Sequence, residues 1–543
     1  MKPPEMRGAL VFGPPFFEGE SGSKWNTNRP FGGSSKTTAG HPPGVRLGIK
    51  KGVRHFGFPM LRNCCYKHVP EDIMRIYNSM TRQKEELTPL EDNHYKIYVC
   101  GPTVYDLFHI GNARPFVTFD TLRRYLIWLG NKVSYIQNFT DIDDKVIIRA
   151  QAEGITPKEL AEEMIDEYFK DADGLNIMRA TKHPRATESI DDIIHLISLL
   201  YDKGFAYMTD DGVYFSIDQY PNYGKLSGHR LDDLIAGASE RVSELEGKRN
   251  PLDFALWKFK KEGEPFWPSP WGDGRPGWHI ECSAMSLANL GETVDIHAGG
   301  VDLQFPHHEN EIAQSEAATG KTFVRYWVHN GFVNVNYEKM SKSLGNFFTV
   351  RDLVEHYPYH ILRFFILQAH YRMPINFSDD LLDAAVTSWQ RIVSCVDLLA
   401  FVANAPDKTK IDPIKDKELE EEIAACRFNW QKAMDDDLNT ADAIAAIFEL
   451  VRAANTAAAS GAVSPETLLS ARDTMIELLD VLGLDPTAEK KDTIPDDILA
   501  MVEERTKAKS ERDFATADRI RDEILERGYK VEDTPQGARV VPV

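Results

Sequence analysis

Two short polar runs, about 230 residues apart, contain the residue types that bind a nucleoside triphosphate. The first ATP run, His109-Ile110-Gly111-Asn112, follows an apolar strand pattern at 95–99 and leads into a helix expected from about Ala113. Small residues there leave the free N–H groups of a helix N-terminus open to a phosphate. The second ATP run, Lys339-Met340-Ser341-Lys342-Ser343, holds two lysines, and mobile lysines suit charge that develops in a transition state. Together the runs predict one ATP site built from distant segments.

Four further side chains are candidate ligands of one metal ion: Cys100, Cys282, His307 and Glu311. If Pro306 begins a helix, His307 and Glu311 lie four residues apart on one helix face. Two thiolates, one imidazole and one carboxylate form a suitable zinc set. The spacing leaves two alternatives open. His308 could replace His307, and a buried cysteine is more often a small apolar side chain than a ligand.

Strand and helix patterns alternate through the part of the chain that carries the first run. Strands are expected at 96–100 and 133–139, and helices at 113–129 and 142–151, which is the rhythm of a parallel sheet. Further strand patterns occur at 277–300 and 326–335, after a turn-rich stretch with several tryptophans. We therefore predict an α/β fold, with a Rossmann-like parallel-sheet catalytic domain formed by 74–190 and 276–335 and interrupted by a connective insertion at 191–275.

The chain beyond residue 350 has a helical pattern. Trp389, Ile392, Val396 and Leu399 follow the spacing of one buried helix face. We predict a region at 336–385 that contains the second ATP run, then a helical bundle at 386–490. A polar, proline-containing linker at 485–495 precedes a small C-terminal unit at 496–543, where a charged helix or two and a short strand ending are expected.

The N-terminal segment 1–73 differs in composition from the rest of the chain. Its first fifty residues contain nine glycines and seven prolines, and 11 basic against 5 acidic residues give 1–73 a charge of +6. Such a segment does not readily form a packed core, so a disordered basic extension is expected. An organelle transit peptide is the alternative, although the Pro and Gly density argues against the amphipathic helix that such peptides need.

The bulk composition narrows the class of protein. The 543 residues are 42% hydrophobic and 27% charged, so a sizeable core is expected in a soluble chain. No apolar run approaches the roughly 18 residues that would span a bilayer, so no membrane partner is expected. A net charge of −20 argues against a nonspecific nucleic-acid coat, although a local basic face can still bind RNA. Six cysteines without a CxxC pair indicate a reducing compartment.

Longer stretches around these residues resemble the cysteinyl-tRNA synthetases of class I. The matching stretches are 98–106, 138–145, 277–285, 305–314 and 339–346. The resemblance extends from about Met74 to the C-terminus, and it places the family's zinc ligands on Cys100, Cys282, His307 and Glu311. One position departs from the family pattern, because the usual histidine at the end of the first ATP run is Asn112. Asparagine can donate a hydrogen bond, but it cannot carry a positive charge.

The resemblance implies a reaction, its substrates and the residues that serve it. The substrates would be L-cysteine, ATP with Mg²⁺ and tRNA(Cys), and one zinc ion per chain would bind the substrate thiolate. The catalytic residues would be His109, Asn112, Lys339 and Lys342. The ATP-binding residues would be His109, Gly111, Asn112, Gly299, Gly300, Asp302 and Lys342. Trp278 would wall the cysteine pocket, and Thr103 and Thr140 are weaker candidates for binding the backbone groups of cysteine.

The C-terminal unit at 496–543 resembles the family's anticodon-binding domain. Phe514 would stack on an unpaired base, and Lys509 or Arg512 would hold phosphate. Asp518 and Asp533 would accept hydrogen bonds from a base edge. A solvated helix face is the alternative for each of these residues.

Two other functions remain as alternatives. A cysteine ligase of the mycothiol pathway has similar ATP and zinc motifs, but it lacks a unit such as 496–543. A catalytically inactive RNA-binding paralogue would be expected to have lost Lys342 or a zinc ligand, and both are present. We therefore expect a monomeric, cytoplasmic enzyme, or one of an organelle matrix if 1–73 is a transit peptide.

Overall fold

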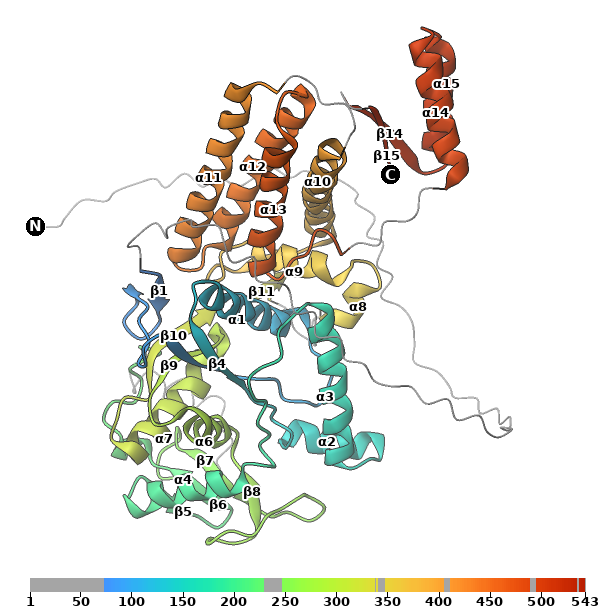
Figure 1. Ribbon diagram of the computed structural model, residues 1–543. Helices are drawn as coiled ribbons and strands as arrows, with labels where there is room; N and C mark the ends of the chain where they lie inside the picture. The colour runs from blue at the N-terminus through green and yellow to red at the C-terminus, as the bar shows by residue number, and fades with distance from the viewer. Residues whose placement is uncertain are drawn as a thin grey trace, which may run out of the picture. The chain divides into compact units, whose positions relative to one another are not determined.

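The computed structural model describes residues 73–228, 247–336, 338–339, 347–404, 411–488, 495–534 and 537–542 (Figure 1). The basic extension predicted over 1–73 lies outside these residues except for Ile73. Most of the second ATP run also lies outside them, because only the backbone of Lys339 is described.

A four-stranded parallel sheet forms the catalytic part of the chain. Its strands are β3 (His94–Val99), β4 (Lys132–Gln137), β9 (Val294–Gly300) and β10 (Val324–Asn330), in the order β10-β9-β3-β4. The predicted α/β fold with a parallel sheet is therefore confirmed. The chain passes from β3 to β4 on one side and later returns to β9 on the other side of β3. Ligands bind at such a switch point, outside the carboxyl ends of the strands.

Helix α1 (Ile110–Trp128) joins β3 to β4 and is buried along most of its length. Its apolar residues share one core with the sheet and with the helical bundle, which explains why α1 has no clear polar face. Pro115 lies in the second turn of α1, where it lacks the N–H that would donate to the Gly111 carbonyl. Helices α2 (Asp144–Glu153) and α3 (Pro157–Gly174) follow β4.

The strand expectation at 277–300 was wrong for its first half. Residues Trp278–Leu290 form helix α6, and only Val294–Gly300 forms a strand, β9. Cys282, Ala284 and Met285 of α6 are buried in a core shared with the insertion, so this helix is apolar around much of its surface. The sequence of this segment therefore lacks the hydrophobic periodicity that distinguishes a helix from a strand.

A second sheet lies within the predicted insertion. After α4 (Ile190–Asp202), the strands β5 (Ala206–Met208), β6 (Gly212–Phe215), β7 (Phe254–Phe259) and β8 (Gly274–Pro276) pair antiparallel in sequence order. The 3-10 turn η1 (Ile217–Gln219) follows β6. Beyond β9, the turns η2 (Val301–Leu303) and η3 (Gln304–His308) lead into α7 (Glu309–Thr319).

A hairpin of β1 (Arg75–Asn78) and β2 (Gln83–Glu86) is tied to β10 by Asn78. The Asn78 amide donates to the Arg325 carbonyl at 2.9 Å and accepts from the Trp327 N–H at 3.1 Å.

After β10, the strands β11 (Val333–Val335), β12 (Glu338–Lys339) and β13 (Ile375–Phe377) form a three-stranded sheet. Helices α8 (Val350–Val354) and α9 (Tyr359–Leu367) lie between β12 and β13 in sequence.

Four long helices follow: α10 (Asp379–Ala403), α11 (Pro413–Asp435), α12 (Thr440–Ser460) and α13 (Pro465–Val481). The predicted apolar face of α10 is confirmed, because Trp389, Ile392, Val396 and Leu399 are all buried. Among the described helices, α10 alone is long and apolar enough to span a membrane by composition. However, 44% of its most apolar window is buried inside the protein, and a core helix passes the same test.

The C-terminal unit contains α14 (Asp496–Ser510), α15 (Phe514–Glu526) and a hairpin of β14 (Tyr529–Thr534) and β15 (Gly537–Pro542). It has a small apolar core of its own, to which Ile498, Ile520, Ile524 and Val531 contribute. The predicted pair of charged helices with a strand ending is therefore confirmed.

Candidate active site

Four candidate metal ligands come together at the carboxyl end of β3, between α6 and α7. One ligand atom from each of Cys100, Cys282, His307 and Glu311 lies within 4.8 Å of the others, and all four residues are buried. The Cys100 and Cys282 sulfur atoms are 4.0 Å apart, and Cys100 Sγ lies 3.6 Å from Glu311 Oε1. His307 Nε2 lies 3.0 Å from Glu311 Oε1, as expected for two residues one helical turn apart.

A second ligand set shares two of these residues. Cys100 and Glu311 also lie within 4.8 Å of His297 and His308 ligand atoms. Cys100 Sγ is 3.3 Å from His308 Nε2 and 3.4 Å from His297 Nε2. The alternative of His308 in place of His307 therefore stays open in the geometry. His297, on β9, was missed in the sequence, where one histidine inside an apolar strand gives little signal.

Buried polar atoms without partners indicate that a cation fits this cluster. Among the described residues, Glu311 Oε2 and His297 Nδ1 have no hydrogen-bond partner, and the nearest ring nitrogen to Glu311 Oε2, His297 Nε2, lies 3.4 Å from it. Burial raises the pKa of the Glu311 carboxyl well above its usual range, which is the expected response of a buried carboxylate without a compensating charge. A buried unpaired acceptor is costly, and a bound cation would compensate it. Soft thiols beside an imidazole and a carboxylate suit zinc.

The protonation preferences of the cluster also suit a metal. A hydrogen bond with the Cys100 thiol lowers the pKa of Cys282 to about 7, so a thiolate is accessible near neutral pH. Burial lowers the pKa of His297 and His308 well below the usual range. Neutral imidazoles are the form that binds metals.

Of the predicted cysteine-binding residues, Trp278 contacts this cluster directly. Trp278 is 39% exposed, and its ring lies 4.4 Å from the His307 ring. Thr103 and Thr140 lie on adjacent parallel segments joined by a bridge. Asn138, which the sequence analysis did not single out, accepts from the Gly101 N–H at 2.9 Å and donates to Thr140 Oγ1 at 3.3 Å. The geometry therefore brings Trp278 against a candidate ligand, and Asn138 links Thr140 to Gly101, the residue after Cys100.

The first ATP run forms the N-terminus of α1. His109 is the N-cap residue, and its ring accepts from the Asn112 N–H at 3.3 Å. The His109 ring lies 4.9 Å from the Phe347 ring, and the Ile110 N–H donates to the Phe348 carbonyl at 3.3 Å. These phenylalanines follow the second run closely in sequence. The fold therefore brings the flank of the second run to the first, although Lys342 and the Lys339 side chain lie outside the described residues.

Gly299 and Gly300 end β9 beside β3, and Asp302 follows in η2. A Cβ on Gly299 would approach the Leu303 side chain to 2.9 Å and the His308 ring to 3.1 Å. A Cβ on Gly300 would lie 2.4 Å from the Asp302 carboxylate, so no larger residue fits there without movement. These residues lie at the switch point of the sheet, as the predicted adenosine site requires.

Arg114 is a residue of this region that sequence reasoning missed. It is fully buried on α1, four residues beyond the start of that helix. Its guanidinium donates to the carbonyls of Phe332 at 2.7 Å and His370 at 3.3 Å, and also to that of Met373. It therefore connects the ATP helix to the loop after β10. A buried arginine can be recognised in a sequence only when its partners are known.

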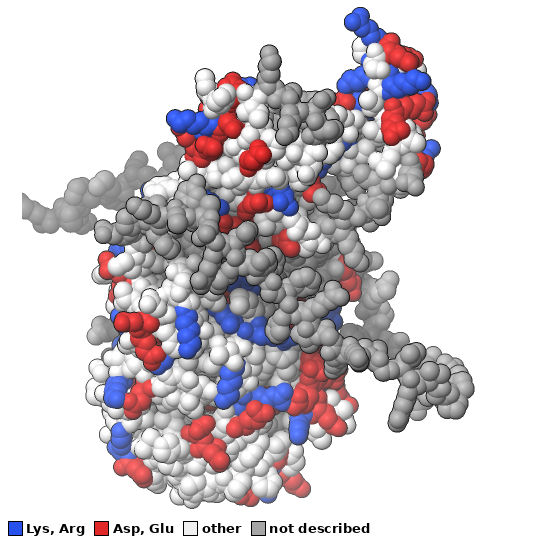
Figure 2. Space-filling model, in the orientation of Figure 1, with Lys and Arg blue, Asp and Glu red and all other residues white. Residues whose placement is uncertain are grey.

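The predicted anticodon residues lie on the C-terminal unit, where α14 and α15 display both acidic and basic side chains (Figure 2). Phe514 is 60% exposed, as a base-stacking role requires. Asp533 is bound at 2.9 Å by both ends of the Arg505 guanidinium and at 2.8 Å by Lys509. The arginine holds the pKa of Asp533 well below its usual range. Asp518 pairs with Arg521 at 3.0 Å.

Comparisons with known proteins agree with this geometry. The family model described as the class I (C) tRNA synthetase catalytic domain matches residues 86–387, and a DALR domain model matches 429–485. The chain is 57% identical over 469 residues to a cysteine–tRNA ligase of Caldicellulosiruptor saccharolyticus, with 86% of this chain and 99% of that protein covered. It is 53% identical over 469 residues to a cysteine–tRNA ligase of Clostridioides difficile, again with 86% of this chain and 99% of that protein covered.

Solved structures of lower identity share the fold. A methionyl-tRNA synthetase of Mycobacterium tuberculosis with methionyl-adenylate matches with a TM-score of 0.53 at 16% identity, covering 72% of this chain and 89% of that one. A leucyl-tRNA synthetase of Agrobacterium radiobacter, in a ternary complex with tRNA, matches with a TM-score of 0.55 at 14% identity, covering 73% and 84%. At these identities the likeness shows the fold alone.

Proposed function

The chain belongs to the cysteine–tRNA ligase family of class I synthetases, and on that premise we propose that one zinc ion selects its substrate cysteine. Membership of this family means that the enzyme aminoacylates tRNA. The finer proposal is that L-cysteine reacts with ATP–Mg²⁺ to give cysteinyl-adenylate, and that the cysteinyl group then passes to tRNA(Cys).

The observation that carries the zinc proposal is the buried ligand cluster with its unpaired carboxylate oxygen. Cys100, Cys282, His307 and Glu311 would hold the ion, which would supply an open position that prefers a thiolate to a hydroxyl. Two thiols favour this set over the alternative set with one thiol, because thiolates are the softer zinc ligands. Trp278 covers the cluster from the partly exposed side.

The proposed zinc site would allow the enzyme to discriminate cysteine from serine. An apolar pocket separates such close isosteres by only about 100-fold. Faithful charging needs roughly 10⁴-fold, which corresponds to about 5.5 kcal/mol at about 1.4 kcal/mol per decade. Direct binding of the substrate sulfur supports discrimination of that size without an editing domain.

The first chemical step follows from the α1 N-terminus. The N–H groups of that terminus, with His109 and Asn112, would bind the phosphates of ATP. The cysteine carboxylate oxygen attacks the α-phosphorus, the bond to the bridging oxygen breaks, and pyrophosphate leaves with the electron pair. Lys339 and Lys342 would neutralise the charge on the phosphates, and Mg²⁺ would accompany the triphosphate.

In the second step, a hydroxyl of the terminal tRNA adenosine attacks the carbonyl carbon of cysteinyl-adenylate. The 2′-hydroxyl is the proposed acceptor, AMP leaves, and the hydroxyl proton is released. Phe514 and Lys509 would contact the anticodon. Arg505 and Lys509 already bind the Asp533 carboxylate, so a base edge would have to share it with them. A monomer in the cytoplasm is the proposed form of the enzyme.

Two linked assays test this function. The purified full chain should catalyse cysteine-dependent ATP–pyrophosphate exchange and should then charge tRNA bearing a GCA anticodon. Exchange without charging would favour a ligase that couples cysteine to another acceptor. Absence of both reactions in a zinc-loaded, folded preparation would contradict the enzymatic proposal.

A further inference from the structure

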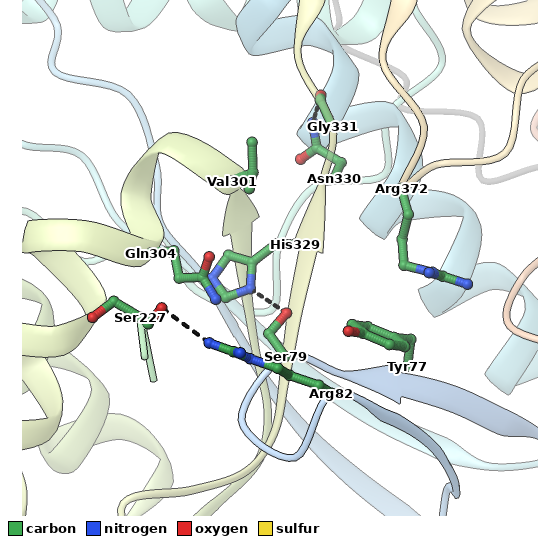
Figure 3. A pocket seen from close by; sticks show the side chains of 10 residues that line it. All are labelled: Tyr77, Ser79, Arg82, Ser227, Val301, Gln304, His329, Asn330, Gly331 and Arg372. Atoms are coloured by element: carbon green, nitrogen blue, oxygen red, sulfur yellow. Dashed lines mark hydrogen bonds between the residues drawn. The ribbon is translucent and has the colours of Figure 1, made fainter. Parts of the chain in front are cut away.

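A separate hollow of about 390 Å³, lined by both polar and apolar groups, lies beyond the carboxyl ends of β9 and β10, beside the β1–β2 hairpin (Figure 3). Residues from five segments line it, among them Tyr77, Arg82, Ser227, Gln304, Asn330 and Arg372. No residue of the first ATP run and no member of the proposed zinc set lines it. It is nevertheless close to the ATP site, because Asn330 on β10 pairs in register with Gly300 on β9.

Asn330 leaves a buried acceptor without a partner at one end of this hollow. The residue is 3% exposed, and its Nδ2 donates to the Gly331 carbonyl at 3.0 Å. Its Oδ1 has no hydrogen-bond partner among the described residues. In Figure 3 this oxygen points away from Gly331, towards the Val301 side of the pocket. An unsatisfied buried acceptor costs about 1–3 kcal/mol, so a ligand N–H is the expected partner.

Arg82 supplies positive charge at the exposed side of the hollow. It lies in the turn between β1 and β2, and its Nη2 donates to the Ser227 carbonyl at 3.2 Å. Within the described part of the chain, no carboxylate forms an ion pair with it. Arg372, in contrast, is neutralised by Asp437 at 2.6 Å while it lies over the Tyr77 ring. Arg82 is therefore the guanidinium that remains for a phosphate.

A buried acceptor opposite an available guanidinium matches a nucleotide whose base carries an amino group. We propose that this hollow binds a nucleotide of the unpaired CCA end of tRNA, a subsite that rests on the proposed charging of tRNA. Cytosine and adenine both present an exocyclic amine, which would donate to Asn330 Oδ1 while Arg82 holds a phosphate. Unpaired terminal bases are readily splayed into protein pockets. ATP carries the same base chemistry, but none of its predicted binding residues that the structure describes lines the hollow.

Two single variants and two partial reactions test this subsite. Asn330→Leu removes the acceptor at similar size, and Arg82→Gln removes the charge. Each should raise the KM for tRNA in charging about tenfold, the size expected from about 1.4 kcal/mol. Cysteine-dependent pyrophosphate exchange, which needs no tRNA, should stay within about twofold of wild type. Arg75→Gln is the matched control, because Arg75 is exposed on the same hairpin outside the hollow and should leave both reactions unchanged.

Direct binding provides the second readout. Wild-type protein should bind intact tRNA about tenfold more tightly than tRNA trimmed of its CCA end, and either variant should remove that difference. A raised KM for ATP in exchange, with an unchanged KM for tRNA, would assign the hollow to the base of ATP and overturn the proposal. Wild-type behaviour of folded Arg82→Gln in both assays would overturn it as well. Failure of the proposed function is distinct, because wild-type protein would then show no exchange.

Discussion

Cys100 and Cys282 are 182 residues apart in the sequence, and their sulfur atoms lie 4.0 Å apart in the structure. The first follows β3 and the second lies on α6, so the parallel sheet and its covering helix together create the pair. The short contact lowers the pKa of Cys282 to about 7. One thiolate is thus made accessible beside the buried Glu311 carboxylate, whose neighbours at ion-pair distance are the His307 and His297 rings.

Replacing Cys282 by serine should lower zinc content and cysteine affinity together. A serine hydroxyl is a harder and far less acidic ligand than a thiol, so the ion and the substrate sulfur would both lose their site. Zinc can be measured by mass spectrometry and cysteine binding by calorimetry. Cys395→Ser is the control, because Cys395 is buried on α10, outside the described metal-ligand clusters. Zinc loss with unchanged cysteine affinity would show that the metal is only structural.

The two neighbouring histidines should respond differently to substitution. His307→Asn should abolish stoichiometric zinc binding, because it removes a proposed ligand. His308→Asn should reduce zinc affinity by about 10–100-fold, the size typical of a residue that supports a ligand. The reverse order in a chelator competition assay would select the second ligand set, with His297 and His308.

Arg114→Met should raise the KM for ATP about tenfold in pyrophosphate exchange, with the KM for cysteine changed by less than about twofold. The reason is that Arg114 holds the carbonyls of Phe332 and His370, so its loss frees the loop after β10 from the ATP helix. Arg114→Lys should recover part of the effect, since a lysine restores the charge but not the fork of donors. Equal increases in both KM values would indicate a general loss of structure instead.

Arg363→Met should lower the free energy of unfolding by about 3–5 kcal/mol. Arg363 is 0% exposed, donates to the Asp120 carboxylate at 2.6 Å, and also binds the Leu482 carbonyl at 2.6 Å. Removing it leaves the buried Asp120 carboxylate with Arg124 as its one remaining arginine partner, at 2.8 Å, and takes a donor from the Leu482 carbonyl at the end of α13. Urea unfolding measures the change, and Arg149→Met is the surface control. The Arg149 pair with Glu153 is solvent-exposed, so a loss of about 0–1 kcal/mol is expected there.

Acidification should destabilise the protein through His183. Burial lowers the pKa of His183 to about 4 from the model-compound value of 6.5. Its Nε2 accepts from the Ala180 N–H at 3.1 Å, so protonation of that nitrogen would also break this hydrogen bond. Between these pKa values the unfolded chain binds more protons than the folded one, so stability falls as pH falls. The contribution between pH 7 and pH 5 is about 2 kcal/mol.

His183→Asn removes this titration and should flatten the pH dependence by the same amount. Urea midpoints of both proteins at pH 7 and pH 5 provide the measurement. Parallel pH profiles for wild type and variant would contradict the assignment to His183.

The sequence predicted much of the chemistry because the motifs are local. His109 to Asn112 mark a helix N-terminus after a strand, and both features appear in the structure as written in the chain. The pairing of His307 with Glu311 followed from helical spacing, and their side chains meet at 3.0 Å. The strand pattern around 133–139 likewise gave β4, with a shift of its ends by one or two residues.

Other features depended on which elements pack together. The residues of helix α6 were predicted to be strand-like, because burial between two layers removes the polar face that identifies a helix in the sequence. His297 gained its place beside Cys100 only when β9 paired with β3. Arg114 binds carbonyl groups, and Asn330 lines a hollow, that are both formed by segments remote in sequence. Their roles could therefore not be predicted from local sequence.

The sequence by itself thus determined the reaction class, the α/β order of elements and the four principal candidate ligands, since residue type and short spacing carry that information. The tertiary structure decided that two alternative ligand sets share Cys100 and Glu311, and that a separate hollow lies beside the ATP site. Both depend on the register of parallel strands and on the packing of α6 and α7, and no local pattern specifies such long-range contacts.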